Sequence, residues 1–382
     1  MKQDSTAIMI VAAEPSADLH GSCLVEEIRQ KRSDLSFFGI GGPRMQQAGV
    51  EIICRMQDLA VIGFTELIGR LILLRRAFSQ TVSLLKQRRP ALLILIDYPG
   101  FNLLLAKKAK DLGIPVMYYI APQVWAWWRS RTRHIARWVA KMVVVLPFEV
   151  PFFAQYGVDA EFVGHPLLDV VRSELSKTEF CQQWSLSPQA PLLGLLPGSR
   201  RQEVKRLFPV MLETAKILKE KFAGLQVAVS RVEGVDISLY QQAVNGTDFE
   251  VRIVEGAPYE MMAHVDLLLV ASGTATLEAG ILGTPMLILY KIAPLSYLIG
   301  RTVARVSNIG LVNIVATKQI VPEFVQSQAR PERIATEALK ILKGKDRARI
   351  MRQQLAEVKE RLGPPGATQR AAEIAVRMLE SE

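Results

Sequence analysis

The chain has 382 residues, 49% of them hydrophobic, and a formal net charge of +10 at pH 7. This length favours two domains, because a single hydrophobic core rarely extends beyond about 250–300 residues. The charge favours anionic partners such as nucleic acid, an acidic membrane or a phosphorylated substrate. Three cysteines without a Cys-x-x-Cys pair argue against a disulfide framework and a cysteine zinc site, and the four histidines lack zinc-motif spacing.

The start of the chain does not predict a secretory signal. Asp4 interrupts it, and the apolar run at residues 8–13 is too short. No uninterrupted apolar stretch reaches the roughly 20 residues of a membrane span. We therefore expect a cytoplasmic protein that is not integral to a membrane.

Strand-like and helix-like segments alternate along the whole chain. In the first half, strands are predicted at 7–13, 36–40, 91–96, 115–120, 141–146 and 161–163, and helices at 21–31, 102–112 and 149–156. In the second half, strands are predicted at 192–196, 226–230, 251–254, 266–270 and 285–290, and closing helices at 331–343, 346–362 and 367–379. The runs are apolar without alternation, which is typical of parallel sheets covered on both faces.

This pattern predicts an α/β protein with two successive doubly wound, Rossmann-like domains. We expect a first domain over residues 1–168, a second over 169–345, and C-terminal helices over 346–382 that pack back on the first domain or on a partner subunit. Ligands of such paired domains bind at the carboxyl ends of the strands, in the central cleft.

Two loops in the second half together predict a binding site for a nucleotide diphosphate. Arg200 follows a predicted strand, where its guanidinium can bind a phosphate through two hydrogen bonds. The segment 272–275 begins a helix whose free N–H groups attract phosphate, and Glu278, one turn later, suits ribose hydroxyls. Ordinary capping would explain either loop alone. The predicted donor residues are Gly198, Ser199, Arg200, Ser272, Gly273, Thr274, Ala275 and Glu278.

Asp97 is the main catalytic candidate in the first half. It ends an otherwise apolar strand, where partial burial would raise the pKa of its carboxyl group and suit a general base toward a sugar hydroxyl. The alternative is an Asp that caps the following loop or helix. In the loop after the first strand, Glu14, Ser16 and Asp18 could orient a substrate, although Asp18 could equally cap a helix.

Residues 121–137 combine aromatic and basic side chains, with Trp125, Trp127 and Trp128 close together before several arginines. Base stacking could make this segment a nucleic-acid site. It could also be an acceptor pocket or a membrane-interface belt, or the tryptophans could pack on the core beside a solvated basic helix.

Residues 63–89 carry more apolar surface than one core-facing helix face needs, next to six basic residues. This combination favours an interfacial helix on anionic lipid. The alternative is a core helix with ordinary basic flanks. The residues predicted to contact the membrane are Phe64, Leu67, Ile68, Leu71 and Leu74.

Taken in order, nine motifs resemble the lipid-A-disaccharide synthase family of GT-B glycosyltransferases over essentially the whole chain. They are AEPSADLHG (13–21), GIGGPRMQQAG (39–49), IGFTELIGRL (62–71), IDYPGFN (96–102), YIAPQVWAWWRSR (119–131), LPFE (146–149), FVGHPLLD (162–169), LLPGSRRQEV (195–204) and ASGTATLE (271–278). The resemblance implies a GT-B fold and an inverting transfer from UDP-2,3-diacylglucosamine to 2,3-diacylglucosamine 1-phosphate. The products would be the lipid A disaccharide 1-phosphate and UDP.

The resemblance also implies no metal or other cofactor, and a peripheral enzyme at the inner face of the inner membrane. It places the family's essential aspartate on Asp97, its phosphate-binding arginine on Arg200, and its ribose-binding glutamate on Glu278. An asparagine of a later family segment falls on Asn313. Where some members have a second acid in the aspartate loop, this chain has Gly100, which makes a two-carboxylate mechanism doubtful.

Other functions stay open on the residues alone. Another GT-B activity on a UDP-sugar, such as an N-acetylglucosaminyl transferase or a 2-epimerase, would use the same phosphate-binding loops. A non-catalytic nucleotide- or nucleic-acid-binding protein could use the aromatic and basic segment, although the resemblance implies no nucleic acid as a partner. A homodimer is compatible with every one of these readings.

Overall fold

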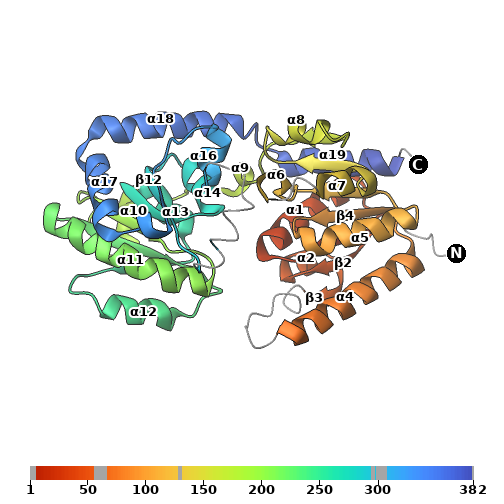
Figure 1. Cartoon of the computed structure of the whole chain (residues 1–382), viewed down its shortest axis with the longest axis horizontal. Helices are drawn as coiled ribbons and strands as arrows, with labels where there is room; N and C mark the ends of the chain where they lie inside the picture. Colours follow the sequence, from red (N-terminus) through yellow and green to blue (C-terminus); the bar gives the residue numbers. More distant parts are fainter. Residues whose placement is uncertain (1–5, 56–66, 128–130, 294–296, 298–307, 381–382) are drawn as a thin grey trace. The chain divides into compact units, whose positions relative to one another are not determined.

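The computed structural model describes residues 6–55, 67–127, 131–293, 297 and 308–380 (Figure 1). The chain divides into two compact units, the first running to Asp169 and resuming at Leu362, and the second comprising Val170–Arg361. The chain therefore passes from the first unit to the second within one residue of the expected boundary at 168. The chain returns to the first unit after Arg361 rather than at 346. Of the closing helices expected to pack together on the first domain, the one that ends at Arg361 therefore belongs to the second unit, and only the last belongs to the first.

The first unit contains a seven-stranded parallel sheet with the order β3-β2-β1-β4-β5-β6-β7. Its strands are β1 (Ala7–Ala12), β2 (Ser36–Gly41), β3 (Glu51–Arg55), β4 (Leu92–Ile96), β5 (Val116–Tyr119), β6 (Lys141–Val144) and β7 (Ala160–Phe162). The central strand β4 is buried along its whole length. Burial of each such Leu or Ile side chain contributes roughly 1.5–3 kcal/mol, which explains why these runs form the middle of the sheet.

Helices cover the first sheet on both faces (Figure 1). They are α1 (Pro15–Lys31), α2 (Pro43–Gln47), α4 (Leu67–Arg88), α5 (Pro99–Asp111), α6 (Val124–Trp127), α7 (Thr132–Trp138), α8 (Glu149–Ala154), α9 (Leu167–Val170) and α19 (Ala367–Glu380). The last helix, α19, packs beside α1, where Lys31 and Glu373 form an ion pair at 3.0 Å. The C-terminal helix thus completes the core of the first unit.

The second unit contains a six-stranded parallel sheet with the order β10-β9-β8-β11-β12-β13. Its strands are β8 (Leu192–Leu196), β9 (Gln226–Arg231), β10 (Arg252–Glu255), β11 (Leu267–Ala271), β12 (Met286–Tyr290) and β13 (Glu323–Val325). Its helices are α10 (Lys177–Gln183), α11 (Arg201–Lys221), α12 (Ile237–Asn245), α13 (Pro258–His264), α14 (Ala275–Ile281), α16 (Leu311–Ala316), η3 (Gln326–Gln328), α17 (Pro331–Lys343) and α18 (Lys345–Arg361).

Strand register brings the predicted site residues to neighbouring strand ends within each unit. Ala12 of β1 lies opposite Ile96 of β4, so the loops that carry Glu14 and Asp97 leave the sheet side by side. In the second unit, Val270 of β11 lies opposite Leu196 of β8, which aligns the two loops predicted to bind the donor. Both arrangements follow from parallel pairing, because all carboxyl ends then meet at one edge.

Candidate functional site

The turn between β4 and α5 presents Asp97 in an unusual backbone conformation. Asp97 and Tyr98 are consecutive non-glycine residues with positive φ angles, of 48° and 47°. The left-handed region costs an L-residue of the order of 1–3 kcal/mol, so two such residues in sequence mark a strained turn. Pro99 follows at the first position of α5, where its fixed φ suits the start of a helix.

The environment of Asp97 suits proton transfer. Burial, and secondarily the charge of Glu14, raise the pKa of the half-buried Asp97 carboxyl to about 6, while the N–H of Tyr98 acts in the opposite direction. A carboxylate with this pKa can accept a proton near neutral pH better than an ordinary aspartate can. The effect of Glu14 agrees with its position at the neighbouring strand end.

The structure shows Asp18 capping a helix, the alternative to a substrate contact. Its buried carboxylate accepts hydrogen bonds from the backbone N–H groups of Gly42 (2.7 Å), Arg44 (3.1 Å) and Met45 (3.2 Å). It therefore caps α2, which begins at Pro43, 25 residues later. In the same loop, Glu14 is half-buried and Ser16 is exposed.

The loop between β8 and α11 satisfies its own amides and leaves a guanidinium exposed. One oxygen of Glu203 accepts hydrogen bonds from the N–H groups of Ser199 (3.1 Å) and Arg200 (3.3 Å). A side chain at Gly198 would start 2.6 Å from the Cβ atom of Glu203, so this position requires glycine. These two amides are therefore already hydrogen-bonded within the loop. The Arg200 side chain is 69% exposed, and its guanidinium forms a loose ion pair with Glu203, at 3.8 Å, that leaves most of its N–H donors facing solvent.

The loop between β11 and α14 combines an open backbone with a half-buried acid. Gly273 and Thr274 are exposed, and no atom lies within 4 Å of where a Cβ on Gly273 would be. The Ser272 hydroxyl donates to the carbonyl of Ile309 at 3.1 Å. Burial raises the pKa of Glu278, in the first turn of α14, to about 7. Together with Arg200 this edge offers a cation, exposed amides and a carboxyl group, a combination that suits a nucleotide diphosphate.

Comparison with known proteins identifies the family. The family model described as lipid-A-disaccharide synthetase matches residues 8–377. The chain belongs to the lipid-A-disaccharide synthetase family. It is 45% identical over 380 residues to the lipid-A-disaccharide synthase of Syntrophus aciditrophicus, with 98% of each chain covered. It is 44% identical over 375 residues to that of Geobacter metallireducens, with 97% of each covered.

Solved structures of other proteins share the fold of this chain. The UDP-GlcNAc 2-epimerase from Neisseria meningitidis bound to UDP-GlcNAc has a TM-score of 0.67 at 11% identity, covering 98% of this chain and 100% of the other. The Staphylococcus aureus MnaA–UDP structure has a TM-score of 0.68 at 10% identity, covering 98% of this chain and 97% of the other. With two parallel sheets, each covered by helices, the chain has the predicted GT-B fold.

Asn313, which the family resemblance singled out, is buried and fully hydrogen-bonded inside the second unit. Its Nδ2 donates to the Val321 carbonyl (2.8 Å) and to Glu323 (2.7 Å), while its Oδ1 accepts from the N–H groups of Ile320 and Val321 (2.9 Å each). These four hydrogen bonds use the normal capacity of an amide side chain. Asn313 thus connects α16 to β13, and its role toward the substrate stays a prediction.

The segment predicted to contact the membrane is only partly described. Phe64 lies outside the described residues, and only the backbone is described at Leu67, Ile68 and Leu71. Leu74 is half-buried and packs against the core of the first unit, which agrees with the core-helix alternative at this position. Its neighbour Leu73 is 43% exposed.

In the aromatic and basic segment, Trp125 packs in the core. Its buried indole donates to Glu149 at 3.1 Å and lies edge-on to Phe148, with ring centroids 5.0 Å apart. Burial raises the pKa of Glu149 to about 8. The sequence analysis did not single out this residue. The side chains of Trp127 and Trp128 lie outside the described part, so a role for them stays a prediction.

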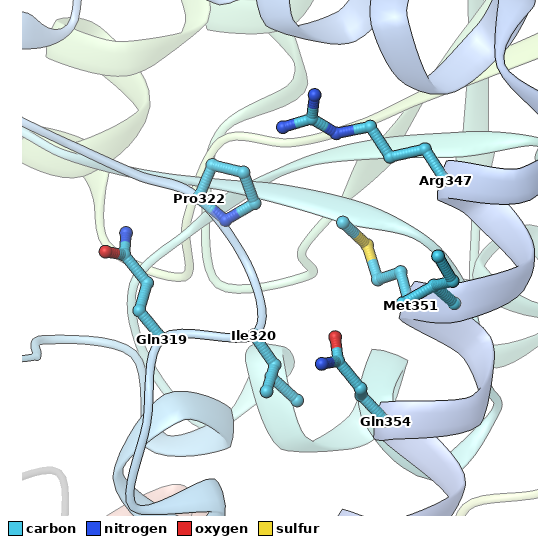
Figure 2. Close-up of a pocket in the computed structure, with 7 residues that line it drawn as sticks. Gln319, Ile320, Pro322, Arg347, Met351 and Gln354 are labelled. Atoms are coloured by element: carbon cyan, nitrogen blue, oxygen red, sulfur yellow. The ribbon is translucent and has the colours of Figure 1, made fainter.

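The described residues show three further features. No group of three or more His, Cys, Asp or Glu side chains among them could hold a metal ion. None of the helices within the described ranges is long and apolar enough to cross a membrane. Figure 2 shows a pocket of about 350 Å³ in the second unit, between α18 and residues 319–322. No predicted site residue lines this pocket, whose lining includes Gln319, Arg347 and Gln354.

Proposed function

We propose that this chain transfers 2,3-diacylglucosamine from its UDP donor to the 6-hydroxyl group of 2,3-diacylglucosamine 1-phosphate, with inversion at the anomeric carbon. The observation that carries the chemistry is Asp97, a half-buried carboxylate with a pKa raised to about 6 in a strained strand-end turn. Family membership supports this reaction over that of a 2-epimerase, whose likeness to the chain is limited to the fold.

In the proposed reaction, Asp97 accepts the proton of the acceptor hydroxyl as its oxygen attacks the anomeric carbon. The bond between that carbon and the phosphate oxygen of UDP breaks, and UDP departs with the bonding electron pair. A single in-line displacement inverts the anomeric carbon and needs no covalent enzyme intermediate. A general base typically contributes 10²–10⁴-fold to such a step.

We further propose that the second unit binds the donor. The exposed Arg200 guanidinium would pair with the diphosphate, where negative charge grows as the bond breaks. The exposed backbone at Gly273 and Thr274 would approach the same phosphates, and Glu278 would accept hydrogen bonds from ribose hydroxyls. The reaction as proposed needs no metal ion or cofactor.

The acylated substrates imply a lipid surface, so we propose that the first unit binds the inner face of the inner membrane peripherally. Support comes from α4, where Leu73, Arg75 and Arg76 are all exposed. Anionic lipid would attract such a surface by roughly 1 kcal/mol for each basic residue near it. A homodimer stays a prediction.

The reaction is tested by incubating the full chain with both substrates in the presence of EDTA, in excess over any trace metal. Mass spectrometry should detect a tetraacyl disaccharide 1-phosphate and UDP, and NMR of the product should show a β-1′,6 linkage. Production of an epimerised UDP-sugar, or hydrolysis of the donor without disaccharide, would refute the proposal.

Membrane binding is tested by sedimentation with vesicles containing anionic lipid. Changing Phe64, Leu67, Leu71 and Leu73 to Ser should reduce co-sedimentation while UDP binding persists. The control is Leu104→Ser in α5, since Leu104 is also exposed, at 55%. High salt should weaken wild-type binding without abolishing it, because salt screens only the contribution of the basic residues. A folded variant that binds vesicles like the wild type would place the membrane contact elsewhere.

A further inference from the structure

The strained turn at Asp97 and Tyr98 requires neighbouring groups that hold it in this conformation. A non-glycine pair with φ angles of 48° and 47° persists only where surrounding groups fix it, because either residue alone would relax to an extended or right-handed conformation. Strain of this kind concentrates at functional sites.

Two buried side chains converge on a single backbone atom of this turn, the carbonyl oxygen of Asp97. The Tyr118 hydroxyl donates to it at 2.5 Å, and the Asn102 Nδ2 donates to it at 2.6 Å. Asn102 also donates to the carbonyl of Ile96 at 3.1 Å. This carbonyl therefore receives two side-chain donors.

The two donors come from rigid neighbouring elements. Tyr118 lies in β5, where it is paired in register with Leu95 of β4, and Asn102 lies in the first turns of α5. Both are 0% exposed. Their positions are set by the sheet and by the helix that the turn connects, so together they can impose a fixed conformation on the turn.

Packing alone does not explain this pair. A Phe would fill nearly the same space as Tyr118, and a Leu nearly that of Asn102, without a buried polar group that needs a partner. Each residue instead directs its donor to the strained peptide. Burial raises the pKa of Tyr118 far above its ordinary value, so its hydroxyl keeps its proton across the whole working range.

We propose that Tyr118 and Asn102 are positioning residues, which fix the Asp97–Tyr98 peptide in its left-handed conformation and thereby fix the position of the Asp97 carboxylate. This inference rests on the proposed role of Asp97 as general base. Both donors bind the main-chain carbonyl of Asp97, so their loss would move the carboxylate and change its hydration without removing the proton acceptor. Small displacements of a catalytic group reduce kcat strongly.

The test is Tyr118→Phe, with Tyr119→Phe as the matched control, since Tyr119 is the next residue of β5 and is equally buried. We expect Tyr118→Phe to lower kcat about tenfold or more, with KM for both substrates within about twofold of the wild type. The acid limb of its pH–kcat profile should move to lower pH, because a carboxylate released from the fixed turn becomes better hydrated. Tyr119→Phe should leave kcat and the acid limb unchanged.

A second variant, Asn102→Ala, should show the same two signatures, and the double variant should lose less than the product of the single losses because both donors act on one atom. Should Asn102→Ala fail to fold, Tyr118→Phe decides alone. A Tyr118→Phe enzyme with wild-type kcat, or with reduced kcat but an unmoved acid limb, would overturn the proposal.

The Tyr118→Phe and Asp97→Asn variants distinguish a failure of the positioning role from a failure of the proposed function. Wild-type turnover in Asp97→Asn would remove the role of Asp97 itself. An inactive Asp97→Asn beside an unaffected Tyr118→Phe would leave that role intact and overturn only the positioning.

Discussion

The turn after β4 and the loop after β8 place a functional residue at a strand end by opposite means. In the first, the backbone is strained, two buried donors fix it, and the acid that it carries is half-buried. In the second, Glu203 satisfies the backbone amides, and the Arg200 side chain extends 69% exposed. Asp97 is fixed at its main chain, whereas the Arg200 side chain is mostly exposed and has only a loose ion pair with Glu203, at 3.8 Å.

The difference matches the chemistry proposed for each residue. Proton transfer requires a base at hydrogen-bond distance from one hydroxyl, so a fixed carboxylate is an advantage. A guanidinium binds a phosphate through several equivalent donors and a long side chain, so it tolerates movement of a diphosphate. Substitutions at the two positions should therefore differ in size and in kind.

The largest expected effect is at Asp97. Asp97→Asn keeps the shape of the side chain but removes the proton acceptor, so turnover should fall by about 10² or more. Calorimetric titration with UDP should give a dissociation constant close to that of the wild type. In the wild type, kcat should decline as the pH falls through about 6, where the carboxylate becomes protonated. Turnover close to wild type in Asp97→Asn would end the assignment.

A smaller effect is expected at Arg200. Arg200→Ala should weaken UDP binding and lower kcat/KM by roughly 10–100-fold. Arg200→Lys should recover only part of the loss, because lysine keeps the positive charge but not the planar two-donor guanidinium. Arg201→Ala, which removes the adjacent exposed arginine, is the control. Equal behaviour of the two alanine variants would mean that the phosphate is bound elsewhere.

The smallest effect is on stability and depends on pH. Because the folded-state pKa of Asp97 is raised from 3.8 to about 6, ionisation destabilises the fold above pH 6, and this cost disappears as the pH falls below about 4. Asp97→Asn should therefore be more stable than the wild type at pH 8 by on the order of 2 kcal/mol, or roughly 4–8 °C in Tm. At pH 4 the gain should vanish. The measurement is thermal unfolding at both pH values, with Asp111→Asn, at an exposed position, as the control. A stability difference between Asp97→Asn and the wild type that is the same at both pH values would contradict this account.

The sequence predicted the central strands of both sheets and two of the four edge strands, β7 and β10. Runs such as 92–96 and 267–271 are buried on both faces, so their apolar pattern is unmistakable. The other two edge strands, β3 and β13, were not predicted, because they are short and half-exposed and contain no continuous buried apolar run.

For the candidate site, sequence reasoning placed Asp97 and Arg200 at strand ends, but it could not reveal which groups are already occupied. The amides capped by Asp18 lie 24 to 27 residues away, and Asn313 is satisfied by backbone groups beyond its own helix. Tyr118 looked like one more apolar residue of a buried strand. Only the tertiary structure shows that its hydroxyl donates a hydrogen bond to the carbonyl of Asp97.

The pairing of α1 with α19 has a consequence for synthesis. Lys31 and Glu373, which form an ion pair, are 342 residues apart. At about 5–20 residues per second, α1 would wait roughly 20–70 s on the ribosome before α19 is made. All of Val170–Arg361 is synthesised within that interval. The second unit can therefore fold completely before the first, because the first unit lacks the partner of α1 until α19 has been made.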